Sequence, residues 1–406
     1  MNVKFHIEEL GTIVKSEIEL KHFLLFSGNS NLGKSYAALM IYSFYEIINN
    51  DAEWEKFQKY FWKEKLYNNI SEFPTFIDFS FETFENYFES NVSRLIGYFT
   101  GNESFKCNVK ISINQIVSFE IGVENEKECY FQCKTTENIE REALIDDYKF
   151  FITQNLRQVL QENNPRKNYL LPPARGGYLG FPASIFDKIP SGMYKEFISQ
   201  LDELASPTKE KPETLNLLDK LLYDIFDGRI LSEKGNLNYN FHGTTIPITA
   251  AASSIKELSP IFLLLKKYHP KQTVILWEEP ENHLHPFLQR KIAVLVSYLI
   301  NNGAKMIITT HSDYFFNQIN NLIKLFHIRK KNNNSQFSKL LKKLKIDENL
   351  IQNPNKIGAY YFEKHNSKKS VIRKQELDYA IPIDAFKENV EKMMQETDFI
   401  NDELYK

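Results

Sequence analysis

The sequence has few cysteines. Among its 406 residues cysteine occurs three times, at Cys107, Cys129 and Cys133, and no two of them have the C-x-x-C spacing of metal and redox motifs. Cys129, Phe131 and Cys133 alternate as residues on one face of a strand do, so we interpret them as buried thiols. So little cysteine suits a reducing compartment, where structural disulfides are rare.

Long hydrophobic runs are also missing. The longest apolar stretches, Ile261–Leu265 and Ile292–Ile300, are far shorter than the roughly 20 residues that a membrane-spanning helix needs. The N-terminus has no basic segment followed by an apolar run, the pattern of a signal peptide. We therefore expect a soluble, cytoplasmic protein without a membrane partner.

The chain has no excess of charge of either sign. Its 50 basic and 52 acidic residues give a net charge of −2, and 42% of the residues are hydrophobic. These values exclude a disordered chain and a uniformly basic protein, and they leave room for a local nucleic-acid-binding patch. The length allows two or three domains, or one large unit with an insertion.

One octapeptide, residues 28–35, satisfies the pattern G-x-x-x-x-G-K-[ST] in full. Its members are Gly28, Asn29, Ser30, Asn31, Leu32, Gly33, Lys34 and Ser35. The apolar run Phe23–Phe26 predicts a buried strand before it, and Tyr36–Ile48 predicts a helix after it. In this setting backbone N–H groups and the helix dipole bind phosphates, Lys34 reaches the β- and γ-phosphates, and Ser35 ligates Mg²⁺. The pattern predicts an ATP and Mg²⁺ site.

Two later strands end in polar residues that suit the same site. Thr273–Trp277 predicts a strand that leads into Glu278 and Glu279, and Lys305–Thr309 predicts one that leads into His311. We assign Glu279 as the general base for water and Glu278 as the carboxylate that supports Mg²⁺. His311 is a catalytic candidate because a neutral imidazole can hydrogen bond the γ-phosphate and the attacking water.

Strands that alternate with helices in this half of the chain predict parallel βαβ units. Helices are expected over Ala250–Tyr268 and Pro286–Asn301. Earlier in the chain, helical patterns cover Asp51–Phe99 and Glu140–Glu162. The remaining β-like runs are Val3–Ile7, Thr12–Leu20, Cys107–Ile113, Gln115–Val123, Glu128–Thr135, Tyr169–Leu171, Arg229–Leu231, Leu237–Phe241, Ala359–Glu363 and Val371–Glu376. A last helix is expected from Ile383 to Glu396.

These motifs together resemble a known family. Gly28–Ser35, the run E-E-P-E-N-H-L-H-P from Glu278 to Pro286, and Thr309–Ser312 look like the ABC-type ATPase heads of the SMC, RecF and OLD group. The closest resemblance is to ATPase subunits of bacterial phage-defence systems of the PARIS and Septu kinds. Tyr169–Gly177, with its Pro-Pro-Ala-Arg turn, resembles an element of those ATPases. The resemblance covers residues 1–48 and 165–325.

The resemblance implies an α/β fold: a P-loop NTPase head of the ABC type with a mixed β-sheet core, N-terminal antiparallel strands and an inserted, mostly helical lobe. It also implies that two heads sandwich two ATPs, each capped by the partner's signature motif. The best local candidate for that motif is Ala252–Lys256, where Ser253 or Ser254 would contact the γ-phosphate in trans. The alternative is that these serines are helix N-caps.

The sequence departs from the family pattern at three points. Glu278 stands where the family has an aspartate, and Ile255 stands where the signature has a glycine. No glutamine is assigned to the Q-loop; Gln115, Gln132 and Gln161 remain equal candidates. Arg175, after the Pro-Pro turn, either reaches the nucleotide or the partner subunit, or forms a structural ion pair.

Lys34 and Glu278 are far apart in the chain, which predicts a split head. We assign residues 1–48 and 165–330 to the head, 49–164 to an inserted lobe, and 331–406 to an extension that completes the head or docks a partner. The aromatic residues of the lobe, such as Phe57 and Phe84, are better explained as a packed core than as a docking surface. The basic cluster from Arg329 to Lys345 is either a DNA contact or a solvated loop.

The leading functional hypothesis is an ATP-binding, slowly hydrolysing ATPase that assembles as a homodimer or higher homo-oligomer. It would act as sensor and scaffold in an anti-phage complex whose effector is a separate subunit, because the tail lacks the motifs of a nuclease. The alternative is a RecF-like, ATP-gated DNA clamp. A P-loop kinase is the least favoured reading, because kinases do not need the acid pair followed by T-H-S.

Overall fold

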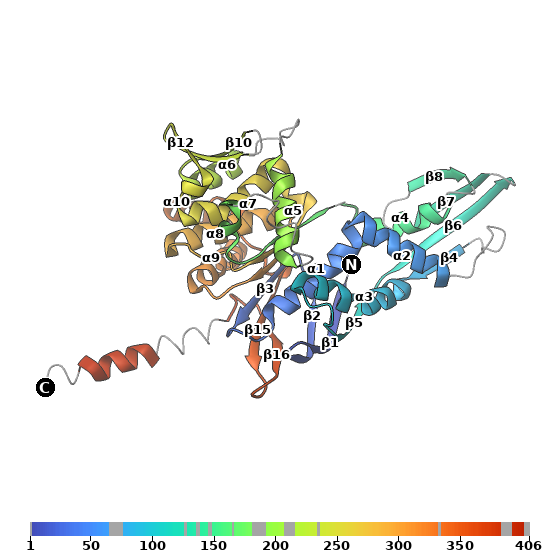
Figure 1. Ribbon diagram of the computed structural model, residues 1–406, viewed down its shortest axis with the longest axis horizontal. Coiled ribbons are helices and arrows are strands. Elements are labelled where there is room, and N and C mark those ends of the chain that lie inside the picture. The colour runs from blue at the N-terminus through green and yellow to red at the C-terminus, as the bar shows by residue number, and fades with distance from the viewer. Residues whose placement is uncertain are drawn as a thin grey trace.

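The computed structural model describes residues 2–64, 76–125, 128–134, 139–144, 148–164, 166–180, 192–206, 216–233, 236–331, 334–382 and 392–401. Its centre is a nine-stranded mixed sheet (Figure 1). In spatial order the strands are β5 (Cys107–Ile113), β1 (Val3–Leu10), β2 (Ile13–Glu19), β16 (Ser370–Lys374), β15 (Ile357–Lys364), β3 (Phe23–Gly28), β14 (Lys305–Thr309), β13 (Thr273–Glu278) and β9 (Lys167–Leu171). The five strands from β15 to β9 are parallel, so their carboxyl ends share one edge. The fold is α/β, and its parallel core has the P-loop directly after β3, the strand between β15 and β14.

The parallel strands are buried on both faces, as their continuous apolar runs predict. Along β3, Leu24 and Phe26 belong to one core, and Phe23 and Leu25 belong to the other. The first core is shared with α1 (Lys34–Asn49), α2 (Asp51–Glu64), α3 (Glu82–Thr100) and α4 (Tyr148–Leu160). The second core is shared with α5 (Met193–Ala205), α6 (Asn216–Phe226), α7 (Ser253–Lys267), α8 (Pro286–Asn301), α9 (Asp313–Lys331) and α10 (Asn334–Leu344).

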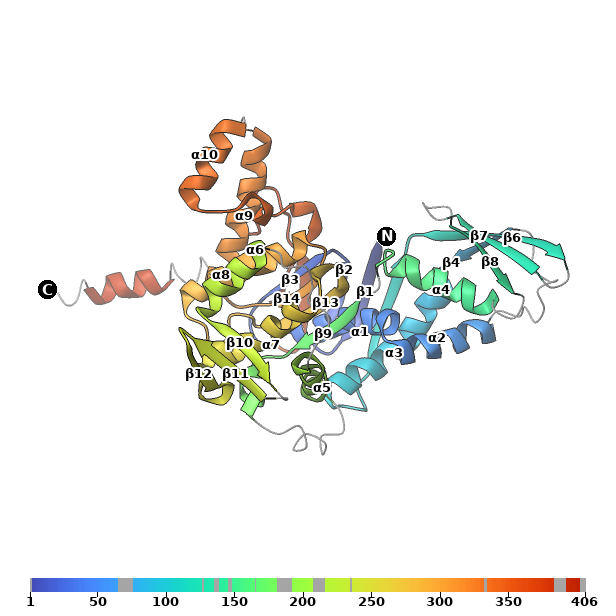
Figure 2. The ribbon, with the colours of Figure 1, turned by 90° about the horizontal axis from the view of Figure 1, so that it is seen from above.

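Two smaller sheets are separate from the main sheet, and the three-stranded one contributes Ile230 and Tyr239 to the second core. A four-stranded antiparallel sheet consists of β4 (Phe76–Ser80), β6 (Ile116–Asn125), β7 (Glu128–Lys134) and β8 (Ile139–Leu144). A three-stranded sheet consists of β10 (Arg229–Glu233), β11 (Asn236–Phe241) and β12 (Thr244–Pro247). In Figures 1 and 2 the two lie at opposite ends of the body, and the helix over residues 392–401 projects from it. None of the described helices is long and apolar enough to cross a membrane.

Most expected elements of the head are confirmed, whereas two expectations for the lobe are wrong. The stretch Asp51–Phe99 is not helical throughout, because β4 pairs with β6 within it. The helix expected over Glu140–Glu162 begins only at Tyr148, because β8 pairs with β7. The β8 sequence I-E-R-E-A-L consists largely of good helix formers, and pairing with a neighbouring strand overrides that preference.

The aromatic residues of α2 and α3 form a packed core, as predicted. Trp54, Phe57, Phe84 and Phe88 are at most 2% exposed and contact the α1 side of the main sheet. Of the cysteines, Cys107 is half-buried on β5, and burial raises the pKa of its thiol. Cys129 and Cys133 lie on β7 as expected, and their side chains fall outside the described residues, as does the part of the expected last helix from 383 to 391.

The main sheet draws strands from all three sequence regions. β5 lies inside the range 49–164 and pairs with β1, and β15 and β16 lie inside the range 331–406. The inserted region therefore contributes one strand, β5, to the main sheet, and in the chain this strand lies between β4 and β6 of the small four-stranded sheet. The division at residues 49, 165 and 331 remains a prediction about organisation along the chain.

Gly28 has a backbone conformation and an environment that exclude a side chain. Its φ is +123°, and a Cβ at this position would lie 2.2 Å from the carbonyl oxygen of Phe362 on β15. We expect Gly28→Ala to lower the free energy of unfolding by about 3 kcal/mol or more, through overpacking and backbone strain together.

The matched control is Gly243→Ala. Gly243 has a φ of +87° but nothing within 4 Å of its ideal Cβ, so only the conformational penalty of about 1 kcal/mol is expected. Denaturant unfolding of both variants separates the two contributions. Equal losses for the two variants would show that the contact with Phe362 is not limiting.

Candidate functional site

The predicted phosphate-binding loop connects β3 to α1. Gly28, Asn31 and Gly33 all have positive φ, which curls the backbone around the start of α1. Asn29, Ser30 and Asn31 are exposed at the tip of the loop, while Leu32 is 6% exposed and anchors it in the core. The Ser370 hydroxyl of β16 donates to the Leu32 carbonyl oxygen at 2.9 Å. The loop is thus held from both sides and has its tip open to a ligand.

Lys34 lies at the centre of the loop. Its ammonium group donates to the carbonyl oxygens of Gly28 at 3.0 Å and Asn29 at 2.7 Å. The side chain is 8% exposed, and burial lowers the pKa of Lys34 to about 8. Three carboxylates, those of Glu279, Glu278 and Glu281, oppose this shift. The structure therefore places Lys34 near all the acids that follow β13.

Glu278 is the last residue of β13 and is 4% exposed. Burial raises the pKa of its carboxyl to about 7, and a hydrogen bond with Ser35 opposes the shift. Its Oε1 atom is buried and has no hydrogen-bond partner among the described residues. Hard cations bind oxygen ligands, and an unpaired carboxylate oxygen beside a serine hydroxyl offers two of them.

The donor set fits Mg²⁺ bound together with phosphates. Ser35 and Glu278 supply one hydroxyl and one carboxylate, and within the described part of the chain no three His, Cys, Asp or Glu side chains gather into a metal site. Mg²⁺ typically binds through one or two carboxylates plus substrate phosphates and waters. The predicted ligands Ser35 and Glu278 are therefore adjacent in the structure.

Glu279 has an unusual backbone conformation. Its φ is +44°, and its N–H donates to the carbonyl oxygen of Thr309 at 3.0 Å. For a residue other than glycine, such a conformation costs about 1–2 kcal/mol. It turns the chain sharply at the end of β13, so the carboxyl groups of Glu278 and Glu279 do not simply alternate across the sheet as in a continuing strand. Such strain is typical of functional sites.

Sequence reasoning missed Glu281. Its Oε1 atom accepts hydrogen bonds from the Thr310 hydroxyl at 2.8 Å and from the His311 backbone N–H at 2.6 Å. Burial raises the pKa of Glu281, and its Oε2 atom has no partner among the described residues. Glu281 fixes the segment that carries His311 to the turn after β13. The available signal was its position, two residues beyond the acid pair.

His311 follows β14, the strand between β3 and β13. Burial, and after it the charge of Lys34, lower the pKa of the imidazole below its usual value. The neutral form therefore predominates at neutral pH, as the proposed hydrogen bond to a γ-phosphate and a water requires. Glu279 acts electrostatically on both Lys34 and His311, and Lys34 acts on His311, so the three side chains lie within one small site.

The serines of the candidate signature lie at the start of α7. The N-cap is Ala252, which offers no side-chain cap, so the interpretation of Ser253 and Ser254 as N-caps is wrong. Ala252 and Ser253 are exposed, and Ser254 is half-buried. The first N–H groups of α7 therefore face the surface beside a hydroxyl, a combination that binds anions.

None of the three glutamines considered for the Q-loop lies at the site edge. Gln115 follows β5, whose last residue, Ile113, pairs with Val3 at the opposite edge of the sheet. Gln132 belongs to the four-stranded sheet. Gln161 donates to the side chain of Asn49, at the far end of α1. The turn after β9 lies next to β13 at the site edge, and it contains prolines instead of a glutamine.

Arg175 in that turn forms the structural ion pair. It is 0% exposed, and its guanidinium lies 3.6 Å from a carboxylate oxygen of Glu257 on α7. It also donates to the carbonyl oxygens of Pro172, Glu257 and Glu278 at 2.9, 2.9 and 3.1 Å. Burial lowers the pKa of Arg175 to about 10. One buried cation thus connects the ends of β9 and β13 to α7.

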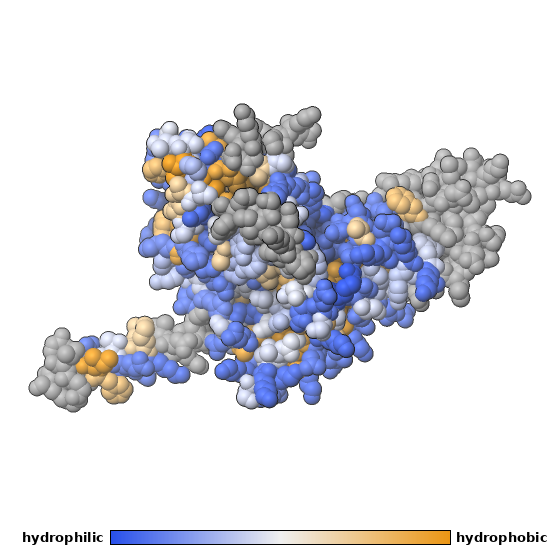
Figure 3. Space-filling model, viewed as in Figure 1, coloured by the Kyte–Doolittle hydropathy of each residue, from blue (hydrophilic) through white to orange (hydrophobic). Residues whose placement is uncertain are grey.

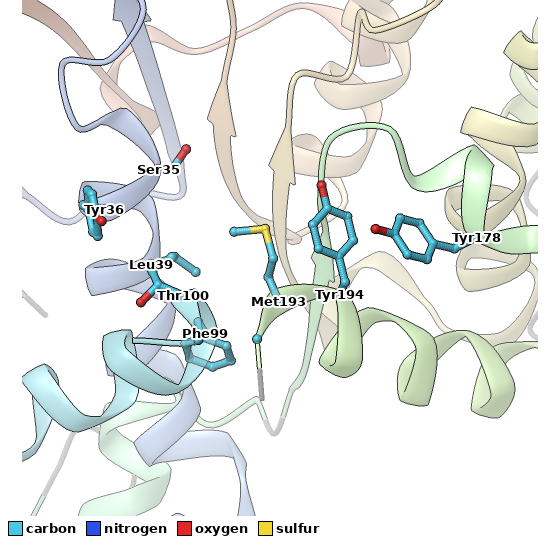
Figure 4. Close-up of a pocket in the computed structure, with 10 residues that line it drawn as sticks. Ser35, Tyr36, Leu39, Phe99, Thr100, Tyr178, Met193 and Tyr194 are labelled. Carbon is cyan, nitrogen blue, oxygen red and sulfur yellow. The ribbon is translucent and has the colours of Figure 1, made fainter. Parts of the chain in front are cut away.

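A cavity of about 460 Å³ opens beside Ser35 (Figure 4). Its walls come from α1, the end of α3, the 3₁₀ helix Arg175–Gly180 and the start of α5. The rings of Tyr178 and Tyr194 stack at 4.7 Å and form one side of it. Ser35 itself is exposed and lines this cavity.

The buried Arg175 gives a test of stability. Arg175→Met leaves the Glu257 carboxylate buried without its counter-charge, so we expect the free energy of unfolding to fall by about 3–5 kcal/mol. The control is Arg329→Met, which breaks the exposed pair with Glu348 and should cost less than about 1 kcal/mol. Denaturant titration measures both. A loss for Arg175→Met no larger than that of the control would refute a structural role.

The raised pKa of Glu278 gives a test by pH. The folded protein binds the Glu278 proton more tightly than the unfolded chain, so its stabilising effect is full below about pH 4.5 and is lost as pH rises through 7. We therefore compare the free energy of unfolding of Glu278→Gln with that of wild type, without Mg²⁺ or nucleotide. The difference in favour of Glu278→Gln should be roughly 3 kcal/mol larger at pH 8 than at pH 4.5.

The comparison for this prediction is Glu55→Gln, at an exposed position on α2. It should leave the pH dependence of unfolding unchanged, since surface pairs contribute little. If the advantage of Glu278→Gln is the same at both pH values, the carboxyl has the same pKa in the folded and in the unfolded protein, and its assigned environment is incorrect.

One protein family model matches residues 137–317, described as "AAA domain, putative AbiEii toxin, Type IV TA system". The matched segment includes β13 with its acid pair and the segment Thr309–Ser312, and it begins after the P-loop. The match supports an ATP-binding ATPase domain. A search of curated proteins finds no match.

Several solved structures are similar at low sequence identity. An SmcHead bound to the C-winged helix domain of ScpA has 10% identity and a TM-score of 0.39, over 93% of this chain and 97% of that chain. The SMC head domain from Thermotoga maritima has 11% identity and a TM-score of 0.33, over 93% and 100%. An Smc head domain with an extended coiled coil, bound to the C-terminal domain of ScpA and derived from Pyrococcus furiosus, has 10% identity and a TM-score of 0.34, over 98% of each chain. The fold assignment rests on the sheet order and P-loop of this chain itself.

Proposed function

We propose that this chain is an ATP-binding and ATP-hydrolysing head of the ABC type that closes on ATP as a homodimer or higher oligomer. One observation carries the proposal. The P-loop after β3, His311 after β14 and the acid pair after β13 follow three adjacent parallel strands and meet at one edge of the sheet. Phosphate binding, water activation and metal support are thereby available at one place.

In the binding step, Lys34 exchanges its two loop carbonyls for the β- and γ-phosphates. The backbone N–H groups of the loop and of the start of α1 contact the other phosphate oxygens. Ser35 and Glu278 would hold Mg²⁺, which would supply positive charge against that of the phosphates. This step gives Glu278 the counter-charge that its buried carboxylate lacks.

In the hydrolysis step, Glu279 accepts a proton from water as the oxygen attacks the γ-phosphorus. The bond between the γ-phosphorus and the β–γ bridging oxygen breaks, and ADP leaves with the electron pair. Neutral His311 donates a hydrogen bond to the γ-phosphate or positions the water, and Glu281 keeps its backbone in place. The positive φ of Glu279 directs its side chain away from the course of β13.

Closure would bring the start of α7 of a second copy onto the γ-phosphate. The exposed Ser253 hydroxyl and the N–H groups of the first turn supply donors for it. Arg175 connects α7 to the Glu278 carbonyl, so the arrangement of α7 and the acid pair is fixed within each copy. The interface would be isologous, with two identical ATP sites.

The biological role proposed for this head is that of sensor and scaffold in a two-component anti-phage complex with a separate effector subunit. It is supported by the resemblance of the motifs. Co-purification of a stable effector protein with the chain tests it. ATP-dependent, salt-sensitive DNA binding by the chain alone would instead support a RecF-like clamp.

Two substitutions at the site should have different effects. Lys34→Ala should abolish ATP binding, because it removes the cation for the β- and γ-phosphates. Glu279→Gln should still bind ATP but hydrolyse it about 10²–10⁴-fold more slowly, since the amide cannot accept the proton. Equilibrium binding of a fluorescent ATP analogue and phosphate release measure the two steps. A wild-type rate for Glu279→Gln would remove Glu279 as the base.

The same Glu279→Gln variant should accumulate as a closed oligomer with ATP, visible by light scattering. Adding Ser253→Arg should prevent this closure, because a bulky cation then occupies the trans contact. The control is Lys256→Arg, which keeps the charge of a residue one turn further into α7. If Ser253→Arg leaves the ATP-dependent oligomer intact, the signature assignment is incorrect.

A further inference from the structure

The C-terminal helix, residues 392–401, exposes an apolar face. Met393, Met394 and Ile400 are 60%, 60% and 61% exposed and lie around Thr397 on one side of the helix, while Phe399, 73% exposed, lies on the opposite side. The helix projects from the body in both ribbon views (Figures 1 and 2). Isolated helices this short are marginal in water, so the apolar face requires a surface to pack on.

The body carries a groove of a suitable kind between α6, α8 and the turn after α10. It encloses about 460 Å³, within the range of about 300–1,000 Å³ for sites that bury a ligand of several side chains. Its floor is apolar and includes Leu221, Ile225, Val294 and Leu350. Figure 3 shows apolar surface both on the C-terminal helix and at the end of the body that carries α6.

The charges of the groove and of the C-terminal segment are complementary. Lys220, Lys291 and Lys345 stand at the groove, against Asp224 and Asp347. The adjoining segment 334–345 has four lysines and no acidic residue. Residues 383–406 have seven acidic and three basic residues, a net charge of −4. Such complementarity steers association and fixes the orientation of partners.

We propose that the C-terminal helix of one copy docks, apolar face inward, in the α6–α8 groove of a second copy. Ile381 is held on its own body, because its backbone N–H and carbonyl both pair with Asn320 of α9, at 2.8 and 2.9 Å. The helix over residues 392–401 lies outside the body and not over α6 (Figure 1). Reciprocal exchange of the two helices gives a symmetric dimer.

The exchanged helices account for two features that ATP binding leaves unexplained. The three lysines at the groove gain acidic neighbours, and the face of the C-terminal helix that carries Met393 and Ile400 becomes buried. The groove contains none of the residues assigned to ATP, and it lies on elements away from the P-loop. This interface therefore goes beyond the proposed function, and it forms without nucleotide.

The test uses the full-length chain without nucleotide, in sedimentation at increasing protein concentration. Wild type should form dimers, and Ile400→Glu or Leu221→Glu should weaken the dimer at least about tenfold, as expected when a central apolar anchor is lost. The matched controls carry the same new charge elsewhere: Gln395→Glu on the side of the C-terminal helix away from Met393 and Ile400, and Tyr223→Glu on the exposed side of α6. Both should dimerise like wild type.

Mixing the two weakened variants identifies the occupant. Copies with Ile400→Glu keep an intact groove, and copies with Leu221→Glu keep an intact helix, so the mixture should form heterodimers with one helix docked. Ile400 is exposed, so its substitution cannot act through unfolding of the body. If wild type stays monomeric and its groove is nevertheless protected from hydrogen exchange, the helix binds the groove of its own chain, which overturns the proposal. Dimers that persist in both Ile400→Glu and Leu221→Glu would also overturn the proposal. So would DNA binding by the groove lysines together with an unchanged dimer in Ile400→Glu.

Discussion

The buried guanidinium of Arg175 is the constraint that ties the site together. A fully buried cation is tolerated only with a counter-charge and hydrogen-bond acceptors around it. Arg175 finds these in Glu257 and in the carbonyl oxygen of Glu278. Glu257 lies one turn after Ser253 on α7, and Glu278 is the acid that ends β13. The surface proposed to meet a second copy and the acid proposed to support the metal are therefore positioned by one ionic cluster. Neither can shift far without leaving a buried charge unpaired.

The same low-dielectric surroundings shift the two ionisable groups nearest the loop in opposite directions. Burial lowers the pKa of Lys34 to about 8 and raises the pKa of Glu278 to about 7, so in each case the neutral form gains. Both groups would regain an opposite charge when phosphates and Mg²⁺ bind, which returns each pKa toward its usual value. Ligand binding is thus linked to ionisation, and part of the binding free energy is used to restore charges that the fold disfavours.

Sequence patterns identified the elements whose signal is local. β13, β14 and α8 are continuous apolar or amphipathic runs that end at clear breaks, and the P-loop is contiguous. β8 was missed because its helix-forming residues become a strand only by pairing with β7. Arg175 was left between two interpretations because its partner, Glu257, is 82 residues away in the chain. Glu281 was overlooked because its role depends on the backbone of His311, which follows a different strand. In each of these cases the structure or role of the residue depends on a partner that is distant in the chain. No local sequence pattern encodes such a partner.

The two proposed interfaces use different surfaces, and this has a geometric consequence. Closure on ATP involves the P-loop edge and the start of α7, whereas exchange of C-terminal helices involves α6, α8 and the segment after α10. Each interface relates two copies by its own twofold axis. Two different twofold contacts on one chain produce a closed assembly of dihedral symmetry if the axes intersect at a suitable angle, which is a tetramer at right angles, and an extending array if they do not. The helix exchange is independent of nucleotide and would supply permanent dimers, and ATP would then decide whether these dimers join. A sensor with this arrangement would respond to ATP by changing its assembly size, because its basic unit is already a dimer.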